Sequence, residues 1–131
     1  MSPRADKEVL DDLIKQWNTI SLKPYKSITF KSYDRKGENI YHTDCMMTLL
    51  HDHAVVCLTT VKSKKERVNL IVELTNPPMN KFPYKILEID RHEIEGMCAN
   101  MFNLVDQQGN NVVVMSDRAR RTYHSENFEQ L

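Results

Sequence analysis

The stretch that most strongly indicates the fold is Ala54-Val55-Val56-Cys57-Leu58-Thr59-Thr60-Val61. It is apolar almost throughout and rich in β-branched residues, a pattern that favours a central strand covered on both faces. Shorter apolar or alternating segments lie on either side of it, between Ile28 and Met115. We therefore predict a β-rich core over residues 27–115.

Further strands are predicted wherever apolar residues alternate or run together between polar breaks. Upstream of the central stretch these are residues 27–33 and 39–50, and downstream they are residues 68–74 and 84–89. Residues 62–67 are predicted to form a charged loop and the proline-rich residues 76–83 an extended surface loop. Residues 93–103 are ambiguous between a short helix and a strand. Residues 104–115 predict a strand, a turn at Gly109 and a last strand.

The N-terminal segment, residues 1–22, has the spacing of an amphipathic helix. Its apolar residues recur at helical intervals and form a single stripe, Val9, Leu10, Leu13, Ile14 and Trp17. Ser2-Pro3 provides a helix start, and Pro24 provides the end. We expect the stripe to pack on a sheet.

Composition limits the classes of protein to which the chain can belong. Its 131 residues predict a single domain, residues 1–131, and 18 basic against 18 acidic residues leave no net charge. A strongly basic nucleic-acid binder is therefore not indicated. No apolar run is long enough to span a bilayer and no signal peptide is visible, so we expect no membrane association. Three cysteines without a CxxC pair predict a reducing compartment, nuclear or cytoplasmic.

Residues capable of catalysis do not form a recognisable constellation. His51 and His53 would face the same side of an extended chain, but no further pair completes a four-ligand zinc site. His42 and Asp44 add only two more potential ligands. Burial in the central stretch would make the Cys57 thiol inert, and Asp44 would disfavour the thiolate of its neighbour, Cys45. The carboxylate pair Glu93 and Glu95 is predicted to be exposed. We therefore predict no catalytic residue, no metal and no cofactor.

Basic and apolar groups give two sets of candidate binding residues. Phosphate contacts are predicted for two basic clusters, with an aromatic ring near the second for stacking on a base: Lys62, Lys64, Lys65 and Arg67, then Arg118, Arg120, Arg121 and Tyr123. The second cluster and this ring belong to a basic polar tail, residues 116–131, which either forms one helical turn or stays mobile. Protein contacts are predicted for the helix stripe and an open sheet edge, at Val9, Leu13, Trp17, Val112 and Val114.

Two stretches resemble the Sm/LSm-like family. Residues 50–61 are similar to that family's Asp-containing loop and following strand, and residues 107–114 to its turn and last strand. The chain departs from the family pattern at Val55, where the family has a base-contacting Asn, and at Gln108, where it has Arg. The resemblance implies a divergent member that assembles with other proteins by strand pairing and has lost uridine-type RNA binding.

The sequence thus predicts an α+β, mostly β fold, in which the helix precedes a small, strongly bent antiparallel sheet or barrel of Sm-like or OB-like type. The predicted function is a non-enzymatic adaptor that assembles with protein partners, as a hetero- or homo-oligomer, in a complex that can include RNA or DNA. The alternative is direct binding of single-stranded nucleic acid through the basic clusters. A small hydrolase or metal enzyme built on His51, His53 and a cysteine is the third hypothesis.

Overall fold

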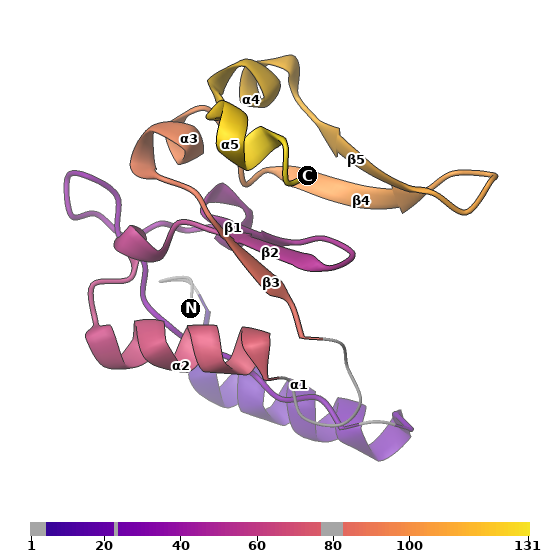
Figure 1. Ribbon diagram of the computed structural model, residues 1–131. Helices are drawn as coiled ribbons and strands as arrows, with labels where there is room; N and C mark the ends of the chain where they lie inside the picture. The colour runs from indigo at the N-terminus through magenta and orange to yellow at the C-terminus, as the bar shows by residue number, and fades with distance from the viewer. Residues whose placement is uncertain (1–4, 23, 77–82) are drawn as a thin grey trace.

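A three-stranded sheet, which includes the start of the apolar stretch 54–61, lies in the middle of the molecule (Figure 1). The structure is a computed structural model that describes residues 5–22, 24–76 and 83–131. Its strands are β1 (Met47–Leu49), β2 (His53–Val56) and β3 (Lys85–Glu88), in the order β1-β2-β3. β1 pairs antiparallel with β2, whereas β2 and β3 run parallel. The prediction of a purely antiparallel sheet was therefore wrong.

A helix, α2 (Lys64–Thr75), makes the crossover between the parallel strands β2 and β3. Parallel neighbours need a long connection, usually a helix, because the chain must return to the same end of the sheet. The Ser63 side chain caps α2 by accepting from the Glu66 backbone N–H, and Leu70 and Leu74 bury one face. The predicted charged loop over 62–67 and strand over 68–74 were wrong, because four-residue spacing of the buried leucines prevailed over the local β-branched pattern.

The helix α1 (Lys7–Ile20) begins after Asp6, whose side chain accepts from the Glu8 and Val9 backbone N–H groups. The predicted start at Ser2-Pro3 lies outside the described residues. None of the α1 residues is buried. The expectation that its apolar stripe packs on a sheet was therefore wrong within the described part of the chain.

Regular structure between α1 and β2 is sparser than predicted. The predicted strand over 27–33 is reduced to an isolated bridge between Tyr33 and Asn39. The predicted strand over 39–50 contains a 3-10 turn, η1 (Thr43–Cys45), followed by β1. The central strand stops early, at Val56, and a second 3-10 turn, η2 (Leu58–Thr60), follows it.

The C-terminal third forms a two-stranded ribbon and three short helices. The helix α3 (Arg91–Glu95) precedes β4 (Met101–Val105) and β5 (Asn111–Met115), which pair antiparallel across a turn. The predicted strand–turn–strand is confirmed, and Gly109 supplies the positive φ of 87° that its turn requires. Residues 116–131 fold into α4 (Asp117–Thr122) and α5 (Ser125–Phe128), more structure than the single helical turn expected.

Two hydrophobic clusters lie on opposite faces of the three-stranded sheet. Val55 of β2 belongs to the cluster shared with α3, the ribbon and α4, whereas Ala54 and Val56 belong to the cluster shared with α2. The prediction that β2 is covered on both faces is confirmed. Helices account for 39% and strands for 19% of the described residues, so the fold is α+β but not mostly β. The two sheets of the described residues do not close into a barrel, and none of the described helices has the length and apolar character needed to cross a bilayer.

Candidate functional site

The most densely hydrogen-bonded group of titratable side chains lies where α3 meets α5, and its centre is Glu93. The Glu93 side chain is fully buried. Its carboxylate accepts from the backbone N–H of Asp90 at 2.9 Å and of His124 at 3.0 Å, and from the Asn127 amide at 3.0 Å. Asp90 in turn caps α3 and accepts from the Glu93 backbone N–H at 2.8 Å, which completes a capping box. A carboxylate with this many donors fixes α5 against α3.

Asp90 and His124 form the exposed rim of this centre. Nε2 of His124 lies 3.2 Å from an Asp90 carboxylate oxygen, and this hydrogen bond, with the nearby Glu93 charge, raises the pKa of His124. The pKa of Asp90 is lowered, chiefly by the hydrogen bond from the Glu93 backbone N–H. Ligand atoms of Asp90, Glu93 and His124 lie within 4.8 Å of one another, a donor set suited to a divalent metal ion. Their mutual hydrogen bonds already give these three side chains a structural role.

The thiol beside this centre is not poised for nucleophilic attack. Burial, with the negative charges of Glu93 and Asp90, raises the pKa of Cys98 to about 12. Burial also raises the pKa of Cys57, and burial together with Asp44 raises that of Cys45. None of the three cysteines therefore has surroundings that favour a thiolate, as expected from the sequence for Cys45 and Cys57.

A second group of polar side chains lies on the turn η1 and the two residues that precede it, just before β1. Tyr41, His42 and Asp44 are exposed there, whereas Met46 at the end of the turn is fully buried. The backbone of η1 is held by hydrogen bonds from Cys45 N–H to the His42 carbonyl and from Cys57 N–H to the Met46 carbonyl. An imidazole, a carboxylate and an aromatic ring are thus held at the surface by an anchored turn.

The histidines of the β1–β2 turn do not form the shared zinc site that the sequence suggested as a possibility. Nδ1 of His53 lies 2.7 Å from an Asp52 carboxylate oxygen, and Lys85 lies 3.4 Å from the other. The pKa of Asp52 is lowered, mainly by the hydrogen bond with His53. The His51 backbone N–H donates to the Asn103 side chain. His53 is therefore engaged with its own neighbour rather than with His51.

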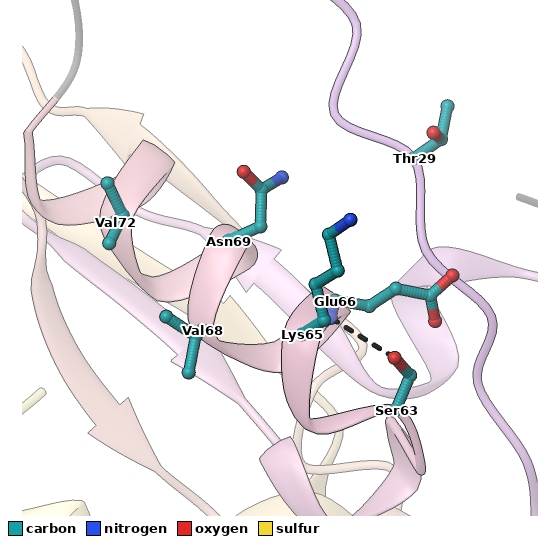
Figure 2. A pocket seen from close by; sticks show the side chains of 7 residues that line it. All are labelled: Thr29, Ser63, Lys65, Glu66, Val68, Asn69 and Val72. Atoms are coloured by element: carbon teal, nitrogen blue, oxygen red, sulfur yellow. Dashed lines mark hydrogen bonds between the residues drawn. The ribbon is translucent and has the colours of Figure 1, made fainter.

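The first predicted basic cluster follows η2 and enters α2. The Lys62 ammonium lies 4.5 Å from the centre of the Tyr33 ring, and Lys64, Lys65 and Arg67 lie on the first turn of the helix. Lys65 also lines an open hollow of about 700 Å³, with Val68, Val72, Asn69, Glu66, Ser63 and Thr29. Figure 2 shows Lys65 and Glu66 extending from α2 on the side of the segment that carries Thr29.

The second predicted basic cluster is largely engaged within the protein. Arg118 donates to the Glu95 carbonyl at 2.7 Å, and Arg120 and Arg121 both pair with Asp117. Tyr123 is buried, and its hydroxyl donates to the Cys98 carbonyl at 2.6 Å. The expectation that its ring is available to stack on a base was wrong, because that ring is part of the core.

The residues predicted to contact a protein partner lie on two separate surfaces. Val9, Leu13 and Trp17 are exposed on α1, Val112 is exposed on β5, and Val114 is half-buried on the same strand. Their role in a contact stays a prediction.

Sequence reasoning missed the α3–α5 centre. It treated Glu93 as a solvated carboxylate, whereas the side chain is buried. The spacing Asp90-x-x-Glu93 was an available signal, because an acidic N-cap followed three residues later by Glu is a capping box. The approach of His124 and Asn127 had no comparable local signal.

Residues 1–131 match the model of a family described as eukaryotic N,N dimethylarginine dimethylhydrolase. Comparisons with curated proteins and with solved structures found no match. The match overturns the resemblance to the Sm/LSm-like family and the interpretation as an adaptor, a ribonucleoprotein component or a nucleic-acid binder. The prediction that the chain is not an enzyme was also wrong, because the matched family is one of hydrolases.

Proposed function

We propose that this chain, which belongs to the eukaryotic N,N-dimethylarginine dimethylhydrolase family, acts in the hydrolysis of the dimethylated guanidino group of N,N-dimethylarginine. The family match over residues 1–131 is the observation that carries this proposal. The described residues support it with polar side chains suited to each chemical need of the reaction.

The reaction consists of three chemical events, which together set the requirements on the protein. Water adds to the central carbon of the guanidinium group, the bond from this carbon to the dimethylated nitrogen breaks, and a proton moves to the departing nitrogen. The products are dimethylamine and a ureido group. The protein must therefore attract a planar cation, orient it, and transfer protons near neutral pH, a task for which histidine is the most common side chain.

Among the five histidines, His42 best combines exposure with suitable neighbours. His53 is engaged by Asp52, and His124 belongs to the α3–α5 centre, where its ring lies 6.3 Å from that of His92. His51 is followed in the chain by Asp52, whose carboxylate already pairs with His53 and Lys85. His42 is exposed at the N-cap of η1, two residues before Asp44, and Asp44 makes no ion pair within the described part of the chain.

The neighbours of His42 match the charge and shape of the substrate. Asp44 places a negative charge on the same turn, and this charge attracts a guanidinium cation. Tyr41 places an aromatic ring beside it, and aromatic faces bind planar or methylated cations. We assign proton transfer to His42, charge attraction to Asp44 and stacking to Tyr41. No cysteine is assigned a role, because burial raises the pKa of all three.

The proposal is tested by incubating the purified chain with N,N-dimethylarginine and measuring dimethylamine and the ureido product together. We expect the two products in equal amounts. His42→Gln should lower kcat by about 100-fold or more, the usual contribution of a positioned acid–base group. Asp44→Asn should raise KM more than it lowers kcat, because it removes attraction for the cation.

His51→Gln is the matched control, since it changes an exposed histidine on another turn. It should leave both kinetic constants unchanged. Failure of the intact chain to release dimethylamine would contradict the proposed activity. Equal losses of kcat in His42→Gln and His51→Gln would leave the proposed hydrolysis in place but refute the assignment of proton transfer to His42.

A further inference from the structure

The α3–α5 centre contains two carboxylates close together, Asp90 and Glu93, and no Lys or Arg of the described ranges forms an ion pair with either of them. Glu93 is fully buried, and the donors that the described residues give its carboxylate are neutral: two backbone N–H groups and the Asn127 amide. Buried charges in proteins are normally paired with an opposite charge or bound to a metal ion. The charge of this centre therefore favours the binding of a cation.

Three metal-ligating side chains converge on this centre from two helices that lie side by side (Figure 1). Asp90 is the N-cap of α3, Glu93 lies on its first turn, and His124 is the N-cap of α5. Asp90 and His124 are exposed and leave the centre open to solvent, whereas Glu93 closes its inner side. We infer that these three residues bind one Zn²⁺ ion. Zn²⁺ takes imidazole and carboxylate ligands together, whereas Mg²⁺ and Ca²⁺ prefer sites made of oxygen alone.

The separations between the ligand atoms suit a tetrahedral zinc ion. Bonds of about 2.0–2.2 Å place the ligands of such an ion about 3.3–3.6 Å apart. Nε2 of His124 and Oδ2 of Asp90 are 3.2 Å apart, and one ligand atom from each of the three residues lies within 4.8 Å of the other two. The ion takes the place of the proton that Nε2 and Oδ2 share. The exposed side chains of Asp90 and His124 then close the remaining distance to Glu93.

Zinc binding leaves the structural hydrogen bonds of the centre intact. Asp90 caps α3 through Oδ1, and His124 donates to Glu93 through its backbone N–H, so Oδ2 and Nε2 are available to the ion. A carboxylate has about four acceptor positions, and the three donors that the described residues give Glu93 fill three of them. The same carboxylate can therefore hold α5 against α3 and ligate the ion.

The inference is tested by titrating the purified full chain with zinc chloride in a calorimeter. We expect one equivalent to bind at micromolar concentration and to raise Tm, because the ion binds the folded state. His124→Gln should weaken binding by about 100-fold or more, and Asp90→Asn by about tenfold or more, since even groups that only support a metal ligand contribute about 10–100-fold. Asn keeps the N-cap of α3, and circular dichroism checks that each variant is folded.

Two matched controls separate this site from the other histidines of the chain. His51→Gln and His42→Gln each remove an exposed imidazole that has an Asp within two residues, and both should leave zinc affinity unchanged. Co²⁺ in place of Zn²⁺ should give the visible absorption of a tetrahedral site without a thiolate-to-cobalt charge-transfer band.

A chain that binds no stoichiometric zinc would overturn the inference, as would binding that survives His124→Gln or a thiolate band with Co²⁺. None of the three ligands is a residue assigned to hydrolysis, and the readout is binding rather than turnover. The zinc site and the proposed activity therefore stand or fall separately.

Discussion

Replacement of Glu93 by Gln is the sharpest test of how the C-terminal helices are held. The Glu93 carboxylate is buried and accepts hydrogen bonds from two backbone N–H groups, of Asp90 and His124, and from the Asn127 amide. Gln has nearly the same shape but keeps only one acceptor oxygen. Its amide NH₂ group must face donors that previously met an anionic oxygen.

The expected loss of stability follows from these contacts. Hydrogen bonds to charged groups contribute about 1.5–3 kcal/mol each, and a buried donor left unsatisfied costs about 1–3 kcal/mol. Because Gln retains part of the network, we expect Glu93→Gln to lower the free energy of unfolding by about 3 kcal/mol. For a chain of this size, such a loss lowers Tm by roughly 10 °C.

Urea unfolding followed by far-UV circular dichroism measures this loss. The matched control is Glu95→Gln on the same helix, where the carboxylate pairs with Arg35 at 2.8 Å at the surface. That exposed pair should contribute no more than about 1 kcal/mol. A Glu93→Gln variant within 1 kcal/mol of the Glu95→Gln variant would refute the view that the buried carboxylate fixes α5 to α3.

Three further outcomes are expected. The His124–Asp90 pair stabilises the fold below the ordinary His pKa of 6.5, and this stability is lost as pH rises through the raised pKa of His124. It is also lost as pH falls below the ordinary Asp pKa of 3.8, because Asp90 becomes protonated. His124→Gln should therefore flatten the alkaline side of the curve of stability against pH, measured by urea unfolding. Gly96→Ala should cost about 1–3 kcal/mol in thermal unfolding, because the added Cβ would lie 2.3–2.5 Å from Thr122 side-chain atoms; an unchanged Tm would show that α3 and α4 do not pack as described. Iodoacetamide should label only Cys45 in the native protein, and mass spectrometry that finds a second labelled thiol before unfolding would contradict the burial of the other two.

Local sequence patterns predicted two kinds of element: strands buried on both faces, and hairpins whose contacts lie within a short stretch of the chain. The run from Ala54 to Val61 contains three of the four residues of β2, and both faces of that strand are covered. The strand–turn–strand around Gly109 needed only alternating residues and a glycine at the bend. These patterns could not predict α2 or η1, because β-branched runs such as that around Val68 satisfy the strand pattern as well as the helical one.

Candidate site residues were less predictable than the fold. The sequence placed imidazoles, carboxylates and thiols along the chain, and its expectation that burial raises the pKa of Cys57 agrees with the structure, but it could not tell which carboxylates are buried. Glu93 and Glu95 are two residues apart and chemically identical, yet one is fully buried and the other pairs at the surface. Only the approach of α5, from about 30 residues further along the chain, separates their roles.

The sequence by itself determined the central strand, the ribbon turn and the amphipathic stripe of α1, because each follows from side-chain periodicity within a short window. Only the tertiary structure decided the parallel pairing of β2 with β3, the crossover helix between them and the burial of Glu93. Those features depend on contacts between residues far apart in the chain, and the free energy of such contacts outweighs local propensity.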